Sequence, residues 1–387
     1  MRGPLRAAGV AAPAPPSAVA TAPRSPAPPG RIWLLLGDKP GDNAQVEAVV
    51  EALGWDCERK VLAWRAPYAT AKPRFRVTLD HLDQTASAPL EPPWPDLVLT
   101  IGRRPSMAAL WVKERSAGCT RLVLFGKPSG LMNRFDLVVA GAEVRLPPLA
   151  NLVPIRLPLM RPRTSDIEAA ISAWQSRLAV LPRPLIAILV GGPTMPFVFD
   201  ARLSERLCRL AGEIVAAGGT PYVTTSRRTP RAVVDALRAK LPASAQLFEW
   251  TPAGADNPYL ALRGLADGFI VTGDSVSMMA EVVRARKPLA ILDLPLGRFG
   301  AIDQWRRAFL RWLFDADRGW RQRIANTAYR AGLVDATRDF RAFHEMLLDQ
   351  GLAVRAGTPL LPPSAAVPDD LPMVVARIRA LMGTPPA

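Results

Sequence analysis

The stretch from Gly268 to Leu292 constrains the fold of this chain more than any other. It opens with an apolar, β-branched run over 268–272, which stops at the small-residue turn Gly273-Asp274-Ser275. A helical segment containing Glu281 follows, and a second apolar strand begins after Lys287-Pro288. This order predicts a βαβ unit, whose parallel strands bind ligands beyond their carboxyl ends.

The turn of this unit is suited to phosphate. A helix that begins at Ser275 or Val276 directs unpaired backbone N–H groups and the positive end of its dipole at the turn. Glu281 lies about two turns into that helix, at about 1.5 Å per residue, where its carboxylate can reach a sugar or ribose hydroxyl beside the phosphates. Such turns also occur without any ligand, so a purely structural elbow is the alternative interpretation.

The spacing favours the ligand-binding interpretation. The segment contains Gly-x-Ser-x-Ser, then Glu, then Lys-Pro and a buried strand. This pattern resembles the donor-sugar motif in the second domain of GT-B glycosyltransferases. The resemblance implies that the helix N-terminus holds the diphosphate of a nucleotide sugar and that the Glu takes hydroxyl groups. The residues that it assigns to the donor are Gly273, Asp274, Ser275, Ser277 and Glu281.

Length and composition limit the alternatives. A chain of 387 residues can form two domains of ordinary size, and no apolar run reaches the ~18 residues of a membrane span. Cys57, Cys119 and Cys208 are far apart and form no CxxC pair, which indicates a reducing compartment. With only His81 and His344 in the sequence, we predict no metal site and no Ser-His-Asp triad, and we interpret both histidines as surface or packing residues.

The net charge of +15 indicates anionic partners. Only seven of the 49 basic residues are Lys, and an excess of Arg also fits a GC-rich genome. The remaining preference is for phosphate groups or an acidic membrane surface. Because the basic residues are scattered and no nucleic-acid module is recognisable, we expect no specific nucleic-acid binding. We expect a cytoplasmic protein, with peripheral contact to the inner face of the membrane as an open alternative.

The order of elements predicts two domains. Residues 1–30, rich in Ala and Pro, predict a disordered tail. Strand-turn-helix patterns then begin twice, each with a Gly-containing turn, and this describes two Rossmann-like, doubly wound α/β domains facing across a cleft, the GT-B architecture. The predicted units are a first, acceptor-side domain over 31–158, a linker with one helix over 159–184, a second, nucleotide-sugar domain over 185–330 and C-terminal helices over 331–387.

Five motifs, taken in order, resemble the mitochondrial-fission ELM family, and the resemblance covers roughly residues 31–330. The resemblance implies a GT-B glycosyltransferase like the bacterial members, whose substrates are poorly defined. Such an enzyme would use a nucleotide sugar as substrate, require no cofactor and act on a lipid-linked or envelope acceptor. The fission role of plant relatives implies the alternative, a catalytically silent scaffold at a membrane surface. The motifs are Gly37-Asp38-Lys39-Pro40-Gly41-Asp42-Asn43-Ala44-Gln45, Gly102-Arg103-Arg104, Phe135-Asp136-Leu137-Val138-Val139, Ser226-Arg227-Arg228-Thr229-Pro230 and Thr272-Gly273-Asp274-Ser275-Val276-Ser277-Met278.

A metal-independent transfer needs groups that stabilise a leaving diphosphate. For this role we predict backbone N–H groups of the loop with Gly191, Gly192 and Thr194. The neighbouring segment Ser226-Arg227-Arg228 would add positive charge, although each of these arginines can also be an ordinary solvated surface residue.

A base must also take the proton of the acceptor hydroxyl. Asp42 and Asp38, on the first Gly-rich loop, are the candidates, and the alternative for Asp42 is an N-cap of the following helix. The resemblance adds a third residue. Family members follow the Phe-Asp-Leu-Val-Val strand with Pro-x-His-Asp, whereas this chain has Ala140-Gly141-Ala142-Glu143. Either Glu143 replaces a catalytic residue here or the site is weakened.

Overall fold

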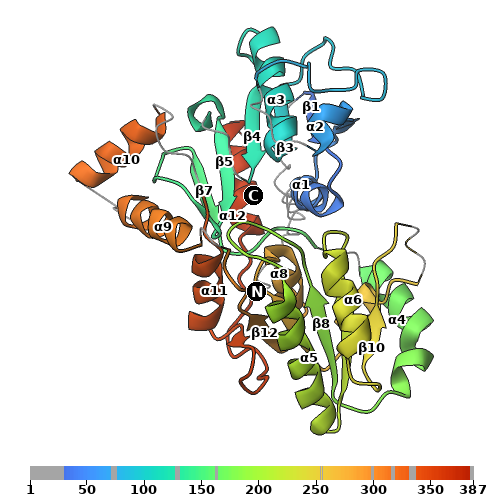
Figure 1. Ribbon diagram of the computed structural model, residues 1–387. Helices are drawn as coiled ribbons and strands as arrows, with labels where there is room; N and C mark the ends of the chain where they lie inside the picture. Colours follow the sequence, from blue (N-terminus) through green and yellow to red (C-terminus); the bar gives the residue numbers. More distant parts are fainter. Residues whose placement is uncertain are drawn as a thin grey trace, which may run out of the picture.

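A computed structural model of the protein describes residues 30–70, 76–126, 131–161, 164–252, 254, 256–297, 300–314, 319–330 and 337–383. Two α/β domains lie one above the other (Figure 1). Of the predicted tail, residues 1–29 lie outside the described residues. Within the described ranges, no helix is long and apolar enough to cross a membrane.

The N-terminal domain contains a six-stranded parallel sheet in the order β2-β1-β3-β4-β5-β7. Its central strands are runs of β-branched and Leu residues that are buried on both faces, as parallel sheets require. The order of strands reverses between β1 and β3, which makes this the switch point where a ligand is expected. The strands are β1 (Ile32–Leu36), β2 (Glu58–Val61), β3 (Leu97–Ile101), β4 (Arg121–Phe125), β5 (Leu137–Gly141) and β7 (Leu152–Ile155).

The C-terminal domain contains a second six-stranded parallel sheet, in the order β10-β9-β8-β11-β12-β14. Numbered along the chain this is 3-2-1-4-5-6, the strand order of dinucleotide-binding domains, with its switch point between β8 and β11. The prediction of two doubly wound domains is therefore confirmed. The strands are β8 (Leu185–Val190), β9 (Thr220–Thr225), β10 (Gln246–Phe248), β11 (Gly268–Thr272), β12 (Leu289–Leu292) and β14 (Val354–Arg355).

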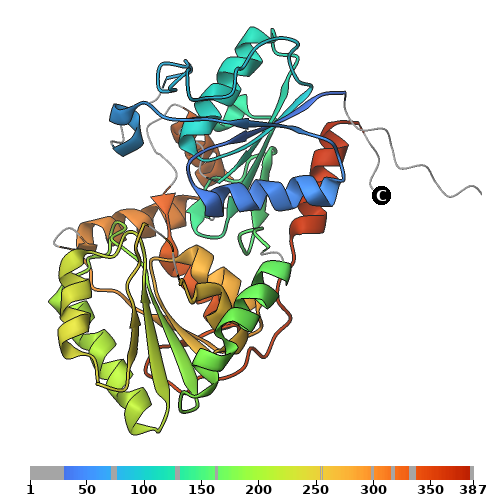
Figure 2. The same ribbon diagram turned by 90° about the vertical axis from the view of Figure 1, so that its right-hand side faces the viewer.

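Helices cover both faces of each sheet. In the N-terminal domain, α1 (Pro40–Leu53) and α12 (Leu371–Leu381) cover one face, and Figure 2 shows α12, in red, crossing near α1, in blue. The other face is covered by α3 (Arg103–Arg115), α9 (Gly300–Phe314) and α10 (Trp320–Arg330).

In the C-terminal domain, one face of the sheet is covered by α5 (Ala201–Ala216) and α6 (Arg231–Lys240). The opposite face is covered by α4 (Thr164–Ala179), α7 (Tyr259–Leu265), α8 (Val276–Arg284) and α11 (Phe340–Asp349). The remaining short elements are α2 (Ala66–Thr70), the 3₁₀ turn η1 (Met132–Arg134) and the antiparallel pair β6 (Val144–Arg145) and β13 (Thr337–Arg338).

The predicted domain boundaries differ from the packing in three places. The helix of the predicted linker 159–184 buries Trp174 and Leu178 in the core of the C-terminal domain. Residues 300–330, predicted to belong to that domain, instead contribute Leu310, Phe314 and Tyr329 to the core of the N-terminal domain. The predicted C-terminal helices 331–387 are divided between the domains and include β13 and β14. Short apolar helices fit either sheet, so the sequence does not specify which one they cover.

Helices α9 and α10 stand out at one edge of the molecule (Figure 1). They bury one apolar side in the N-terminal core and expose another. The exposed large apolar side chains on these two helices are Ile302, Trp305, Phe309, Trp312, Trp320 and Ile324.

Candidate functional site

A cleft of about 650 Å³ lies between the two domains, at the carboxyl ends of the strands in both sheets. This volume falls within the range of ordinary small-molecule sites. The N-terminal domain contributes Lys39, Asp42, Arg103 and Glu143 to its walls. The C-terminal domain contributes Arg227, Arg228, Tyr259, Asp274, Ser275, Ser277 and Glu281, and Arg338 of β13 also lines the cleft.

The predicted elbow after β11 is present, and α8 begins at Val276 with Ser275 as its N-cap. Ser275 itself is tied into the turn, because its N–H donates to the Thr272 carbonyl at 3.2 Å. The first N–H groups of α8 have no acceptor within the helix. Since Ser275, Val276, Ser277 and Met278 line the cleft, these groups and the positive end of the helix dipole lie at its wall.

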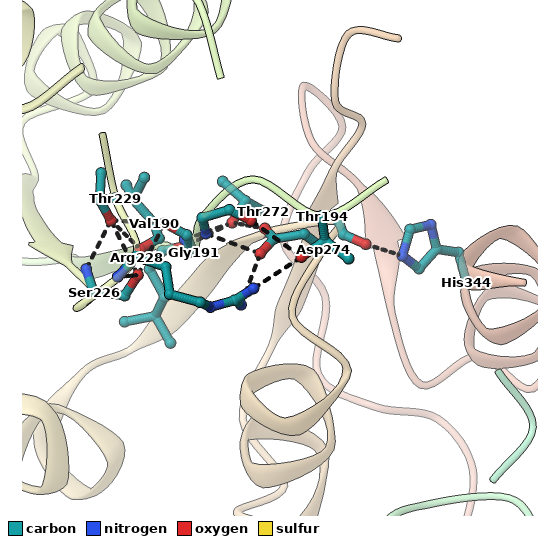
Figure 3. A network of polar contacts seen from close by, with 12 residues as sticks. Val190, Gly191, Thr194, Ser226, Arg228, Thr229, Thr272, Asp274 and His344 are labelled. Atoms are coloured by element: carbon teal, nitrogen blue, oxygen red, sulfur yellow. Dashed lines mark hydrogen bonds and ion pairs between the residues drawn. The ribbon is translucent and has the colours of Figure 1, made fainter. Parts of the chain in front are cut away.

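A network of hydrogen bonds holds the elbow against the loop after β8 (Figure 3). Asp274 accepts from the N–H of Gly192 at 2.9 Å and from the hydroxyl of Thr272 at 2.7 Å, and Thr272 in turn accepts from the N–H of Gly191 at 2.8 Å. A Cβ atom at Gly191 would lie 2.3 Å from the Asp274 carboxylate, so this approach requires glycine. Burial raises the pKa of Asp274, and the hydrogen bonds from Gly192 and Thr272 oppose that rise.

This network gives the loop after β8 a structural role. The N–H groups of Gly191 and Gly192, predicted to face phosphates, are already bonded to Thr272 and Asp274. The Ser226 hydroxyl donates to the Gly191 carbonyl at 2.9 Å, and Gly191, Gly192, Thr194, Ser226 and Gly273 do not line the cleft. These residues form the support behind the α8 N-terminus.

The two predicted arginines differ in their contacts. Arg228 donates to the Thr194 hydroxyl at 2.8 Å and lies 3.4 Å from the Asp274 carboxylate, so it belongs partly to the support (Figure 3). The Arg227 side chain makes no hydrogen bond or ion pair with any described residue, and it is exposed in the cleft wall. Arg227 is therefore the guanidinium that is available to an anion.

Glu281 lies on α8 and faces the same cleft. Its Oε2 atom accepts a hydrogen bond from the Tyr259 hydroxyl at 2.8 Å and lies 3.0 Å from the guanidinium of Arg263, whose side chain is 4% exposed. Burial raises the pKa of Glu281, and the charge of Arg263 and the Tyr259 hydrogen bond oppose that rise. The second oxygen, Oε1, accepts no hydrogen bond from the described residues and is the one that a ligand hydroxyl can use.

His344 supports the elbow from α11. Its Nε2 atom lies 2.8 Å from the Gly273 carbonyl, and since a carbonyl only accepts, that nitrogen carries the proton (Figure 3). The interpretation of His344 as a packing residue is thus correct, and the packing fixes the turn that begins α8. His81, interpreted in the same way, is buried and stacks on Trp64 with 5.8 Å between ring centroids.

Replacing His344 with Gln should reduce the loss of stability on acidification. Burial lowers the pKa of His344, whereas the unfolded chain keeps the ordinary value of about 6.5. As the pH falls through that value toward the lower pKa of His344 in the folded state, the unfolded state binds a proton first and stability is lost. Gln keeps an N–H donor for Gly273 but does not titrate. We expect a flatter melting-temperature profile between about pH 8 and about pH 5.

The matched comparison is His81→Gln, because burial also lowers the pKa of His81 in the other domain. The double variant should have the flattest profile. A His344→Gln profile that follows the unmodified protein throughout would contradict the assigned contribution.

On the opposite wall, the loop after β1 presents the two predicted aspartates differently. Helix α1 begins at Pro40 with Lys39 as N-cap, so Asp42 lies in the first turn and the N-cap interpretation is wrong. Asp42 lines the cleft, 3.6 Å from Lys39 Nζ. Asp38 instead lines an adjoining pocket of about 290 Å³, where its carboxylate accepts from Trp64 Nε1 at 2.8 Å and from Arg104 at 3.5 Å.

Glu143 occupies the turn between β5 and β6 and is 8% exposed. Its Oε2 atom is buried without a hydrogen-bond partner among the described residues, and Oε1 lies 3.8 Å from Arg338. A Cβ atom at Gly141 would lie 2.2 Å from Oε2, so glycine at that position lets the carboxylate fold back over the strand end. A buried carboxylate oxygen without a hydrogen-bond partner is costly, and a group of this kind in a ligand cleft is characteristic of functional sites.

Several residues that line or support the cleft were missed from the sequence. Tyr259 and Arg263, on α7, hold Glu281; Arg338 reaches Glu143 from β13; Thr272 and His344 fix the elbow. Apart from the bond of Thr272 to Asp274, each of these contacts joins residues that are distant in sequence. Only the place of Thr272, at the end of a predicted strand, carries a local signal.

The sequence matches the model of the family described as mitochondrial fission ELM1 over residues 40–313. The chain belongs to the mitochondrial fission ELM1 family. A curated relative, the mitochondrial fission protein ELM1 of Arabidopsis thaliana, is 26% identical over 220 residues, which are 51% of each chain. The present ELM1-family chain therefore spans about half the length of that relative.

Solved structures with a similar arrangement include S. aureus MnaA with UDP, at 12% identity and a TM-score of 0.45, covering 91% of this chain and 97% of that one. Another is the ADP-heptose lipopolysaccharide heptosyltransferase II of E. coli, at 14% identity and a TM-score of 0.41, covering 68% and 84%. These values are too low to compare sites, and the GT-B-like fold of this ELM1-family protein follows from its own two sheets.

Proposed function

We propose that this ELM1-family protein is a metal-independent glycosyltransferase that moves a sugar from a nucleotide-sugar donor to a membrane-associated or cell-envelope acceptor. One observation carries the proposal: the N-terminus of α8, the free Arg227 and the partly buried Glu281 meet on one wall of a 650 Å³ cleft between two doubly wound domains. Helix N-termini and guanidinium groups are the usual protein partners of phosphate.

The donor would lie along the C-terminal wall. Its diphosphate would accept from the first N–H groups of α8 and from Arg227, while Oε1 of Glu281 takes a ribose hydroxyl. Asp274 keeps the elbow in place. The charge of its carboxylate is compensated, because it is paired with Arg228 and accepts a hydrogen bond from the Gly192 N–H.

The acceptor would approach from the N-terminal wall. In the transfer step, the bond from the anomeric carbon to the diphosphate oxygen breaks and its electron pair leaves with the diphosphate. A bond from the acceptor oxygen to that carbon forms, and the hydroxyl proton passes to a carboxylate. Glu143 and Asp42 both line this wall, and we propose Glu143 as the base because its buried Oε2 is unpaired.

A nucleotide panel tests the proposal. UDP, GDP, CMP, ADP and their common sugars are added to the purified protein, and the melting temperature is followed. A ligand that binds only the folded state, present at a concentration of about 100 times its Kd, stabilises the protein by about 2.7 kcal/mol. Arg227→Gln should weaken the responding nucleotide about tenfold, equal to about 1.4 kcal/mol, whereas Arg231→Gln, a substitution on α6 outside the cleft, should not. No response to any nucleotide would contradict the proposal.

The second candidate is a non-catalytic scaffold that binds partners at a membrane surface. The departure at Ala140–Glu143 and the exposed apolar side of α9 and α10 favour it. The same nucleotide panel separates the two functions, because a scaffold does not require a nucleotide site.

A further inference from the structure

The exposed apolar side of α9 and α10 has the composition of a surface that meets lipid. Ile302, Trp305, Phe309 and Trp312 recur at intervals of three and four residues, so they lie on one side of α9. Trp320 and Ile324 continue this surface on α10. The four aromatic residues form a connected row, with ring centroids 6.1, 5.8 and 6.4 Å apart from Trp305 through Phe309 and Trp312 to Trp320.

This exposure is concentrated in one place. Trp305 is 72% and Trp320 64% exposed. Among the described residues, every aromatic side chain that is exposed to such a degree lies on these two helices. Scattered exposed apolar residues need no explanation, whereas a contiguous row marks an interaction surface.

The charge of the surface indicates its partner. Residues 300–330 contain seven arginines and three aspartates, a net charge of +4. Asp303 is paired with Arg306 and Arg307, so that carboxylate is neutralised. The Arg321 guanidinium lies 4.3 Å from the centroid of the Trp312 ring, and the Arg323 side chain is exposed and makes no ion pair with a described residue.

A cavity of about 570 Å³ opens beside this row. Trp305 and Trp312 contribute to its walls, and Phe197 and Phe340, with 5.4 Å between ring centroids, line it from the C-terminal domain. Its aromatic and aliphatic lining suits a hydrocarbon chain, while the guanidinium of Arg311 in the same wall is already paired with Asp339 and Glu345. Tryptophan rings beside arginines are typical of surfaces that enter the headgroup region of an anionic bilayer.

We infer that the surface made by Ile302, Trp305, Phe309, Trp312, Trp320 and Ile324, with Arg321 and Arg323, docks the protein on an anionic membrane. The aromatic rings enter the headgroup region, and the exposed guanidinium of Arg323 contacts lipid phosphates, while Arg321 donates to the Trp312 carbonyl and holds that ring in place. Asp339, Phe340 and Arg341 of the cavity wall directly follow Arg338, which lines the cleft. Docking therefore places the cleft next to the bilayer. The inference does not depend on sugar transfer.

Vesicle co-sedimentation of the full-length protein tests this inference. The vesicles are phosphatidylcholine alone, or phosphatidylcholine mixed with phosphatidylglycerol. We expect binding to the anionic vesicles at least about tenfold tighter than to the neutral ones, weakening as salt rises from about 0.1 to about 1 M. The Trp305→Ser/Trp320→Ser double variant should lose at least about tenfold in partitioning, and Arg323→Gln should lose part of the salt-sensitive binding.

The matched control is Val180→Ser/Leu361→Ser, which removes two side chains of similar exposure, 79% and 60%, on the C-terminal domain. It should bind like the unmodified protein. Since all four positions are exposed, the melting temperatures should remain unchanged. Brominated phosphatidylcholine in the anionic vesicles should also quench tryptophan fluorescence of the unmodified protein, but quench the double Trp variant less.

Absence of binding to either vesicle would overturn the inference, as would equal binding by the double Trp variant. Equal affinity for neutral and anionic vesicles would overturn the role of the arginines. If the protein ignores vesicles but forms a concentration-dependent oligomer that Trp305→Ser/Trp320→Ser dissolves, the surface belongs to a second copy of the chain and the inference is wrong.

Discussion

The Glu143→Gln variant is expected to bind the donor normally and to transfer sugar between about 10²- and 10⁴-fold more slowly. Gln has nearly the same shape as Glu but cannot take a proton. Because Oε2 of Glu143 is buried without a hydrogen-bond partner among the described residues, the substitution removes no hydrogen bond there, and the melting temperature should stay the same or rise. The rate is measured as release of nucleoside diphosphate from the donor identified by the panel.

The matched variant is Asp42→Asn, on the same wall of the cleft. Asp42 is partly exposed, with 38% of its side chain accessible, and pairs with Lys39. We expect a smaller effect on the rate than from Glu143→Gln. Normal turnover in Glu143→Gln together with its loss in Asp42→Asn would transfer the role of base to Asp42.

Glu281→Ala is expected to cost about 3–5 kcal/mol of unfolding free energy and to abolish nucleotide binding. Arg263 is 4% exposed, and removing its only ion-pair partner among the described residues leaves an uncompensated buried charge. The Tyr259 hydroxyl also loses its acceptor. Urea denaturation followed by circular dichroism measures the first effect, and calorimetric titration with the nucleotide measures the second.

A double variant separates the two roles of Glu281. In Glu281→Met/Arg263→Met, both charges are replaced by apolar groups, so most of the stability should return, whereas nucleotide binding should not. Glu249→Ala is the control: it breaks a surface pair with Arg238 in the same domain and should cost only about 0–1 kcal/mol. Normal nucleotide affinity in the double variant would show that Glu281 does not touch the donor.

The sequence predicted those parts of the fold that depend on local pattern. Apolar, β-branched runs such as 268–272 are strands because both faces of a parallel sheet are buried. The spacing from the elbow to Glu281 likewise placed the carboxylate on the correct helix, and the structure places it in the cleft. Whether this site binds a nucleotide sugar stays a prediction.

The remaining features depend on contacts between distant residues. The Gly192 N–H is unavailable to phosphate because Asp274, 82 positions later, accepts from it, and no local pattern shows this. Helix α9 has apolar residues on two sides, so periodicity could not tell which side is buried or against which sheet. The chemistry of Glu143 depends on Gly141, which permits its side chain to fold back.

Helix α12 packs on the N-terminal domain, and this has a consequence for synthesis on the ribosome. Arg379 of α12 donates to the carbonyl of Leu53 at the end of α1, 326 positions earlier, and Val374 and Ile378 complete the core beneath that helix. One face of the N-terminal sheet therefore stays partly uncovered until α12 has been made. During that interval its exposed apolar surface is open to chaperones and to aggregation.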